Sequence, residues 1–449
     1  MSASGDDSSI DGLSNGFDTM RLQCRISSGV SDEVDVFVMS ESGKPVYCYS
    51  RREDSITLMG VCVALIHVVD SVHSDTVRHI QTTSGLRITF SHKPPLIICL
   101  VFRVNSGVDS SILVNQVNAQ IVSILTAKTL KSVFEQRQTF DLKRLLSGSE
   151  KLIDTLIDVI LNPIDANKCD QQMAKSHKKA NQVNAYLTSS TTTFRTIGTQ
   201  SVVNNRNHIS GRVYIPIRLM STSLRESVYN IITSCASSAP NVVFSLLFSV
   251  DKKFKDENNC NNNEIQLILV CNHNSKARIN ALDIQLIYSL VIASESQLSS
   301  VESFWLPICL PRFDSNNFLH THISYLSDEY CLALLTTDRE DFHKCQLMKD
   351  SVIDRLAKVH LQPSRSSLAD LALPQIQYLW YQSVRQSVLW RQSTVADFSP
   401  LNHYITNRML KSNLKTFWLR SETDGLLLGW HLTTFQLYVQ FDVTITQLQ

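Results

Sequence analysis

The sequence predicts an α+β protein in which one structural unit occurs three times. The first observation is an order of segments, from residue 34 to residue 161, that fits a hairpin, an apolar helix, three strands and a closing helical region. The second is that this order returns between residues 242 and 358 and, in part, between residues 376 and 441. The third is length, since 449 residues have room for two to four domains.

The first unit begins with a hairpin, because apolar residues alternate from Val34 to Ser40 and a turn sequence follows. Val46 to Tyr49 is the second strand. From Ser55 to about Ser71 apolar residues recur at helical spacing, and since nearly all residues there are apolar we expect a buried helix. The later elements are strands at 77–82, 86–90 and 96–104 and a helical region at 110–161, with a break near 139–141 and a polar turn at 146–150.

The second and third units follow the same plan. The second has strands at 242–250, 265–271, 305–310, 318–326 and 331–336, a helix at 281–293 and a closing helix at 339–358. The third has strands at 376–382, 387–392, 416–420, 426–432 and 435–441, with a polar helical stretch reaching Lys411, but no closing helix. A five-stranded antiparallel sheet with helices on its faces is the layout of a longin or roadblock-type domain.

The domain organisation follows from these units and from composition. We expect a disordered, acidic, Ser-rich tail at 1–33, a first domain at 34–162, a polar and mildly basic linker at 163–210, a second domain at 211–360 and a third at 361–449. An Asn-rich loop at 251–263 interrupts the second domain. The linker could touch anionic lipid or acidic protein tails, although so sparse a charge run is more simply solvated.

Composition limits the partners and the compartment. Lys and Arg total 42 and Asp and Glu total 41, so no overall field favours nucleic acid or an anionic membrane. The longest apolar stretches are too short for a membrane span, and the N-terminal segment does not resemble a signal or transit peptide. The 11 cysteines are scattered without a C-x-x-C pair, which predicts reduced thiols in a cytoplasmic protein.

Candidate catalytic and metal sites each have a simpler explanation. His320 and His322 could begin a metal site with Asp314 or Asp338, but histidines are common on half-exposed strands. Thr337 to Asp341 is better explained as the N-cap and first turn of the closing helix.

Nucleophilic and acid–base chemistry are equally unsupported. His67, Asp70 and His73 could form an acid–base group, although histidines on a helix face or in a core are far more common. Cys48 and Cys62 have apolar neighbours, which disfavour a reactive thiolate. We expect no enzyme that makes or breaks covalent bonds, and no cofactor.

Four segments, in order, resemble the SAND family of vacuolar fusion proteins, the monensin-sensitivity proteins. They lie at 40–47, 140–150, 322–326 and 337–342: SESGKPVY, FDLKRLLSGSE, HISYL and TDREDF. The resemblance covers roughly Val34 to Tyr438 apart from the linker and the Asn-rich loop, and it implies three longin domains.

The resemblance implies binding and exchange rather than covalent catalysis. It implies a heterodimer with a second tri-longin protein, the calcium–caffeine–zinc-sensitivity protein. Such a heterodimer would be the guanine nucleotide exchange factor of the late-endosomal Rab GTPase, Rab-seven, in early-to-late endosome conversion, lysosome or vacuole fusion and autophagy. Recruitment by an early-endosomal Rab or by phosphatidylinositol 3-phosphate, and a peripheral endosomal location, come with the family. The alternative is a passive longin-type adaptor or tether without exchange activity.

For the partner and GTPase interface, the resemblance directs attention to the first hairpin and helix. We expect Glu41, Ser42, Lys44 and Pro45 to form an exposed recognition turn; alternatively, Gly43 and Pro45 merely shape the turn. Residues 145–150 are either a second docking surface or only a helix connection. Relatives of this family continue into a terminal amphipathic helix, so we expect a truncated or alternatively spliced third domain with one apolar sheet face open.

Overall fold

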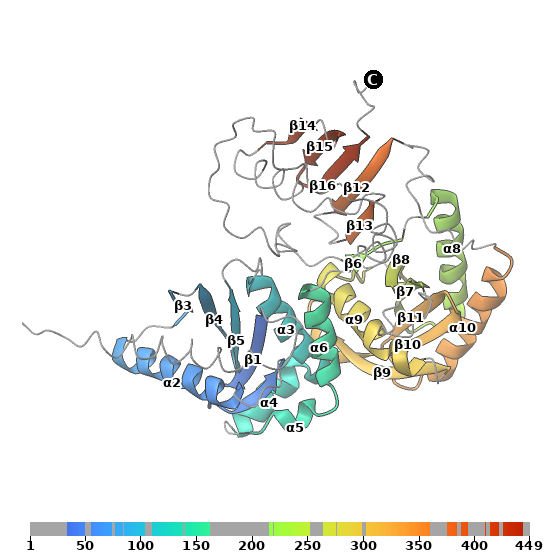
Figure 1. Cartoon of the computed structure of the whole chain (residues 1–449). Coiled ribbons are helices and arrows are strands. Elements are labelled where there is room, and N and C mark those ends of the chain that lie inside the picture. The colour runs from blue at the N-terminus through green and yellow to red at the C-terminus, as the bar shows by residue number, and fades with distance from the viewer. Residues whose placement is uncertain are drawn as a thin grey trace, which may run out of the picture. The chain divides into compact units, whose positions relative to one another are not determined.

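The computed structural model describes the sheets and most of the helices predicted from the sequence (Figure 1). It divides into two compact units, residues 1–154 and 155–449, and the second unit contains the second and third domains. The residues described are 34–49, 55–73, 77–83, 85–103, 110–137, 140–161, 215–218, 220–251, 264–274, 276–298, 302–359, 375–383, 388–393, 409, 414–421 and 425–442. The predicted tail, linker, Asn-rich loop and C-terminal residues therefore lie outside the described residues.

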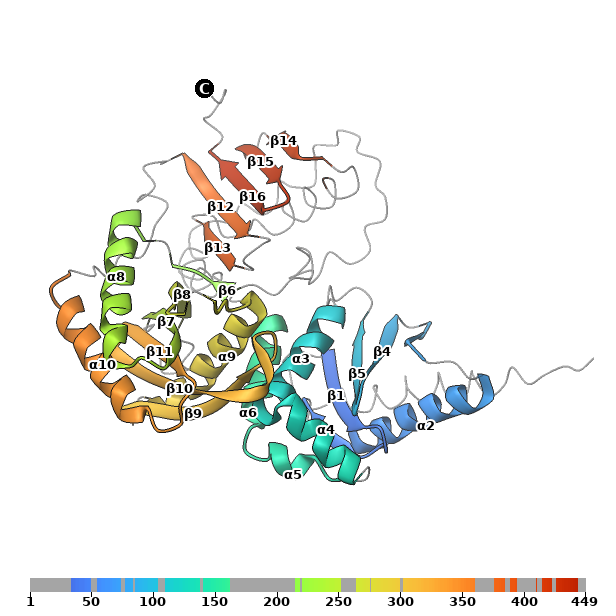
Figure 2. The same ribbon diagram turned by 180° about the vertical axis from the view of Figure 1, so that it is seen from behind.

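The first domain is a five-stranded antiparallel sheet in the order β2-β1-β5-β4-β3. Its strands are β1 (Val34–Ser40), β2 (Pro45–Cys48), β3 (His79–Gln81), β4 (Leu86–Lys93) and β5 (Leu96–Arg103). Its helical segments are α2 (Ser55–His73), α3 (Ser110–Leu125), α4 (Ala127–Gln136), α5 (Lys143–Leu146) and α6 (Glu150–Leu161). One face of the sheet packs against α2 through Phe37, Met39, Met59, Cys62 and Ile88, and α3 lies against β4 and β5 (Figure 2).

The predicted helical region from residue 110 is interrupted earlier than expected. Thr126 has a φ of 65°, which ends α3, and its hydroxyl accepts a hydrogen bond from the Thr129 amide at 3.2 Å, which caps α4. A threonine at positive φ leaves no periodicity signal, because the apolar spacing continues through it.

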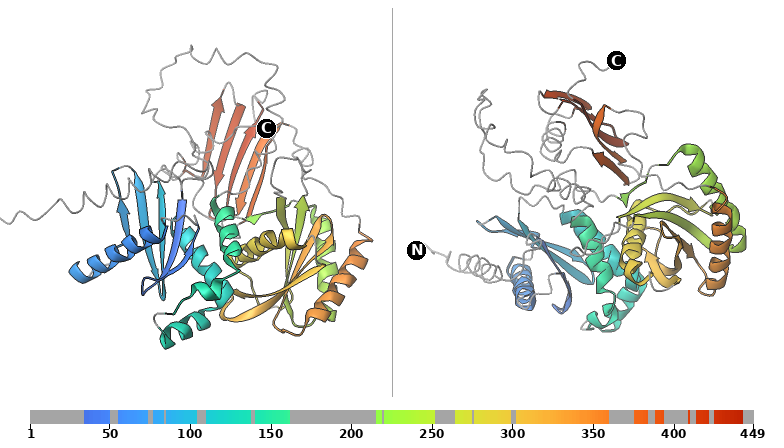
Figure 3. Two further views of the ribbon diagram at one scale, coloured as in Figure 1. Left: turned by 60° about the horizontal axis from the view of Figure 1, so that its bottom comes forward. Right: turned by 45° about the vertical axis from the view of Figure 1, so that its right-hand side comes forward.

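The second domain repeats the sheet with the order β8-β7-β11-β10-β9. Its strands are β7 (Val242–Asp251), β8 (Glu264–Asn272), β9 (Ser303–Leu310), β10 (Asp314–Ser327) and β11 (Tyr330–Thr336). Its helices are α8 (Thr222–Cys235), the short 3₁₀ helix η3 (Ala236–Ser238), α9 (Ala281–Leu298) and α10 (Phe342–Leu356). In Figure 3, right, α8 and α10 lie side by side, and they pack on one face of the sheet.

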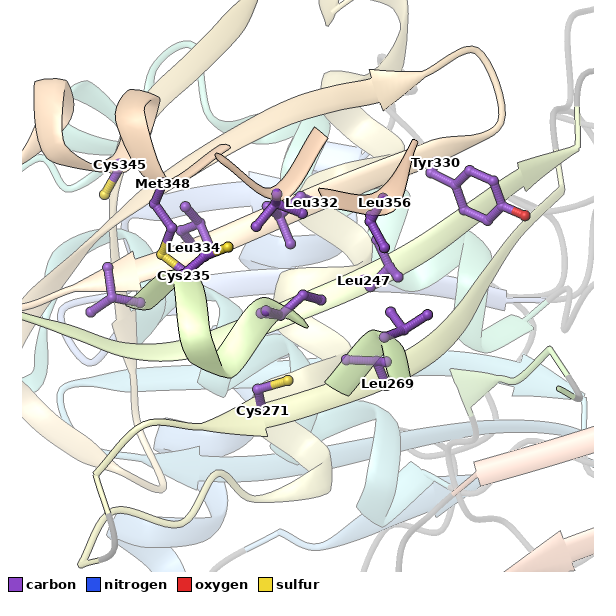
Figure 4. Packing of buried hydrophobic residues seen from close by; sticks show 14 of the residues in the cluster. Cys235, Leu247, Leu269, Cys271, Tyr330, Leu332, Leu334, Cys345, Met348 and Leu356 are labelled. Carbon is purple, nitrogen blue, oxygen red and sulfur yellow. The ribbon is translucent and has the colours of Figure 1, made fainter. Parts of the chain in front are cut away.

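Figure 4 shows the core between that sheet face and the two helices. Leu247, Leu332 and Leu334 from the sheet meet Cys235 of α8 and Met348 of α10, all at most 2% exposed. On the opposite face, α9 contributes Tyr288, whose hydroxyl donates to the Ile265 carbonyl oxygen at 2.9 Å. The sequence prediction missed α8. Its buried residues, Val228, Ile232 and Cys235, form only a narrow stripe among Ser, Thr and charged residues, so the helical spacing is a weak signal.

The third domain has β12 (Ile376–Ser383), β13 (Val388–Ser393), β14 (Thr416–Ser421), β15 (Gly425–His431) and β16 (Phe435–Phe441). Their order is β14-β15-β16-β12-β13, and β6 (Ile215–Pro216) pairs with β13 as a sixth strand (Figure 3, left). Of the predicted polar helical stretch, only Met409 is described, and it packs under Tyr378, Trp380 and Tyr438. On the other face of the sheet, Trp418 and Trp430 are 49% and 39% exposed.

The three sheets share one topology, as the sequence predicted. In each sheet the first strand of the opening hairpin lies between its partner and the last strand, and the two middle strands complete the sheet on the far side. The predicted α+β fold of three longin-like sheets is therefore confirmed.

Candidate interaction surface

The turn between β1 and β2 is held by its own backbone. The Ser40 amide donates to the Lys44 carbonyl oxygen at 2.9 Å, and the Gly43 amide donates to the Ser40 carbonyl oxygen at 2.8 Å. The buried Ser40 hydroxyl accepts from the Lys44 amide at 3.1 Å. Gly43 has a φ of 79°, a conformation that favours glycine, so this residue shapes the turn.

The four residues predicted as a recognition turn, Glu41, Ser42, Lys44 and Pro45, are all exposed. Glu41 Oε1 lies 2.8 Å from His92 Nε2 of β4, and the Glu41 amide donates to the Pro95 carbonyl oxygen at 3.1 Å. These contacts fix the turn against the neighbouring β4–β5 connection. The side chains of the turn are therefore presented from a well-anchored backbone.

Helix α2 lies directly behind this turn. A Cβ atom at Gly43 would stand 3.0 Å from Val63 Cγ1, so the turn and the helix approach as closely as a glycine allows. The side of α2 that faces away from the sheet exposes residues spaced three or four apart: Thr57, Gly60, Ala64, His67 and Val68. The turn and this stripe form one surface, which we call the α2 face.

The prediction that α2 is buried is wrong for its outer side. Among its described side chains only Met59 and Cys62 are buried, and Val68 is 56% exposed. No charged residue occurs between Ser55 and Val69. An exposed, uncharged helix face of this kind is typical of an interaction site.

The segment at 145–150 connects α5 to α6. Leu142 and Leu146 are each 1% exposed and anchor the short helix α5, which lies against the edge strand β2. Beyond it, the Gly148 amide donates to Glu150 Oε2 at 2.8 Å, and Tyr47 of β2 donates to Asp154 Oδ1 at 2.5 Å. Leu145 is 40% exposed beside this anchor.

The histidines proposed as metal ligands are engaged in packing. His320 stacks on Trp305 with a centroid distance of 5.7 Å, and Nε2 of the buried His322 lies 3.2 Å from Gln346 Oε1. The pKa of His322 is lowered to about 4, mainly by burial, while the hydrogen bond with Gln346 acts in the opposite direction. Asp314 accepts hydrogen bonds from Asn316 and Asn317 instead. In the part of the chain that the structure describes, no three potential ligands come together.

The acidic segment at 337–341 forms a turn before α10. The predicted start of the closing helix, residue 339, is wrong by three residues. The N-cap is Asp341 rather than Thr337 or Asp338, and α10 begins at Phe342. Asp338 Oδ1 accepts from the Glu340 amide at 2.9 Å, while Asp341 accepts from Lys344 Nζ at 2.6 Å. Although desolvation raises the pKa of Asp341, the hydrogen bonds from Lys344, Asn241 and Thr336 hold it below its ordinary value.

The cysteines considered as nucleophiles lie in or beside the first core. Cys62 is buried against Cys99, and a hydrogen bond between the two, with burial, raises the pKa of Cys99. Cys48 is half-buried, and all eight cysteines within the described ranges are free thiols. Of the acid–base candidates, His67 is exposed on the α2 face, whereas the side chains of Asp70 and His73 are outside the described set. Within the described helices, none is long and apolar enough to cross a membrane.

Comparison with known proteins bears on this surface. Residues 34–156 match the family model of the first longin domain of FUZ, MON1 and HPS1, and residues 265–354 match the second. The first match includes the whole α2 face. The bacteriophytochrome RpBphP3 from R. palustris overlaps 94% of this chain and 86% of its own at 9% identity with a TM-score of 0.16, which carries no structural argument.

Curated relatives match nearly the whole chain. The chain is 28% identical over 431 residues to vacuolar fusion protein MON1 homolog A of Gallus gallus, covering 90% of this chain and 66% of that protein. It is 28% identical to Protein SAND of Takifugu rubripes, covering 90% and 70%, and 27% identical to MON1 homolog A of Homo sapiens, covering 90% and 55%. The chain thus spans about 55–70% of the length of these relatives.

Proposed function

Because the chain belongs to the SAND/MON1 family of vacuolar fusion proteins, we propose that it is one subunit of a heterodimeric guanine nucleotide exchange factor. Its GTPase is the late-endosomal Rab, Rab-seven, and its partner is the second tri-longin protein, the calcium–caffeine–zinc-sensitivity protein. It acts at the conversion of early to late endosomes and at vacuole or lysosome fusion. An early-endosomal Rab and membranes with phosphatidylinositol 3-phosphate recruit it.

The observation that supports this proposal is the α2 face. The stretch of α2 from Ser55 to Val69 has no Asp, Glu, Lys or Arg, and Val68 on its outer side is 56% exposed, so this stretch gains from a partner with a matching apolar surface. The adjoining turn adds exposed polar groups at Glu41, Ser42 and Lys44, which suit the rim of such an interface. The α2 face therefore accommodates the partner subunit, with the turn reaching the GTPase.

Exchange requires no covalent chemistry from these residues. A subunit pair that binds the nucleotide-free GTPase more tightly than the loaded form lowers nucleotide affinity by the same factor, since coupling between two ligands is reciprocal. The work is done by differential binding of surfaces. Burial raises the pKa values of Cys271 and Cys345 to about 12, so these thiols are not activated as nucleophiles, and the proposed exchange mechanism does not need them to be.

The test is release of a fluorescent GDP analogue from Rab-seven, measured with this chain co-expressed with its tri-longin partner and with other Rabs as controls. Selective acceleration supports the exchange factor. Stable pairing without acceleration contradicts it and favours the passive adaptor.

Lys44→Glu tests the recognition turn in the same assay. We expect exchange to slow by about tenfold, because a charge at an interface rim mainly changes association. The matched control is Lys128→Glu, the same charge reversal on the exposed surface of α4, which should leave the rate unchanged. Equal rates for both variants would remove the turn from the mechanism.

A further inference from the structure

Residues 215–218, which we call the clasp, contact the sheets of the second and third domains at the same time. Ile215 and Pro216 form β6 and pair in parallel with Val388 and Leu389 of β13. The next residue, Ile217, forms a parallel bridge with Leu267 of β8. Four consecutive residues therefore extend two different sheets.

The contact with β8 includes a backbone hydrogen bond. The Arg218 amide donates to the Leu267 carbonyl oxygen at 2.9 Å. β8 is the outer strand of the second domain's sheet, so this bond occupies one of its otherwise open backbone acceptors. Arg218 is only 7% exposed at this position.

The contact with the third domain is apolar as well as strand-like. Ile217 packs onto the sheet face that contains Ile376, Leu379 and Val439, three residues of β12 and β16. Ile215 is 1% exposed, and β6 also lies against α9 of the second domain. The clasp thus pairs its backbone with edge strands of both domains, and its apolar side chains are buried or half-buried where it does so.

We propose that the clasp binds the third domain to the second, so that the two move and unfold as one body. The clasp is remote in sequence from β13, so the stability of the third domain depends on residues at the start of the second domain. Releasing it would uncover the strand edges of β8 and β13 together. Partner surfaces on the two domains are accordingly presented in a fixed relation, a property independent of exchange activity.

Hydrogen exchange of the full chain, followed by mass spectrometry, tests this inference in the variant Ile217→Asp. A carboxylate cannot stay in the apolar contact with Ile376 and Val439, so the clasp should release. We expect amides of β12, β13 and β16 to exchange about tenfold faster or more, because their opening no longer requires opening of the second domain. Amides of β10 and β11 should keep their wild-type rates, and Ile217→Val should behave as wild type.

A second pair of variants tests the backbone contact without a buried charge. Arg218→Pro removes the amide that donates to Leu267, while Arg218→Ala removes the same side chain and keeps that amide. Faster exchange in both β8 and β13 for the proline variant than for the alanine variant supports the clasp. Unchanged rates in β12, β13 and β16 for both Ile217→Asp and Arg218→Pro would overturn it.

Discussion

Val68 is the position at which a binding role for α2 is most clearly separated from a structural one. Its side chain is 56% exposed on the α2 face, whereas Met59 on the opposite side of the helix is 3% exposed and packs against the sheet. The substitution Val68→Glu places a charge on the outer face and leaves the core untouched. Met59→Ala does the reverse, so the two variants form a matched pair.

The expected effects on folding follow from these exposures. Val68→Glu should change the free energy of unfolding by no more than about 0.5 kcal/mol, because the site is at the surface and Glu favours helix more than Val. Met59→Ala should cost about 2–5 kcal/mol, because it removes buried methylenes from a packed core. For a domain of this size, each kcal/mol lowers the melting temperature by about 2–4 °C.

The expected effects on binding are opposite. If the tri-longin partner covers the α2 face, Val68→Glu buries an unpaired carboxylate and should cost about 2–4 kcal/mol of binding, roughly a 30- to 1,000-fold loss of affinity. Folded Met59→Ala protein should bind with nearly wild-type affinity. Thermal unfolding and titration of the purified partner measure the two quantities. A Val68→Glu variant that folds normally and binds with unchanged affinity would refute the assignment of this face.

Two further predictions concern strain and pH. Gly43→Ala should destabilise the first domain by about 1–2 kcal/mol through its left-handed φ. The loss should exceed that of Gly85→Ala, because Gly85 has a similar φ of 82° but open space where the Cβ would lie. Equal losses in thermal unfolding would show that Val63 of α2 can move aside for the added methyl group. His322, with a folded pKa of about 4 against 6.5, should lower the second domain's stability as pH falls from 6.5 to 4, whereas Asp283, raised mainly by burial to about 6 from 3.8, should increase it as pH falls from 6 to 4. Each effect on the free energy of unfolding is on the order of 3 kcal/mol. Denaturant titrations at a series of pH values should therefore show that the free energy of unfolding changes with pH in opposite directions in Asp283→Asn and in His322→Gln. The same pH dependence in both variants would contradict these pKa shifts.

The sheets could be predicted because strand signals are local. Alternating or continuous apolar runs bounded by turn residues placed all five strands of each domain close to their observed positions. The repeat then supplied the topology, since three segments with the same element order are most simply three copies of one sheet. The turn at 41–45 was predictable for the same reason, because Gly43 and Pro45 occur between two clear strands.

Features that depend on tertiary contacts could not be predicted. Helix α8 presents only a narrow apolar stripe, including Val228 and Ile232, and its helical state is fixed by packing on α10 and the sheet. The clasp pairs with strands far along the chain, and no local pattern encodes such pairing. The start of α10 was misplaced because Asp338 and Asp341 both suit a cap, and the contact of Asp341 with Thr336 decides between them.

The outer face of α2 was misjudged for a related reason. A uniformly apolar helix predicts burial without saying what covers it. Helix α9 follows the opening hairpin of the second domain as α2 follows that of the first, and its side chains from 283 to 291 are all buried, with β6 lying against it. On α2, by contrast, the described residues do not cover the outer side, since Ala64 and Val68 remain exposed. An apolar helix is favoured where both of its sides are removed from water, and the proposed partner subunit would supply that cover for the outer side of α2.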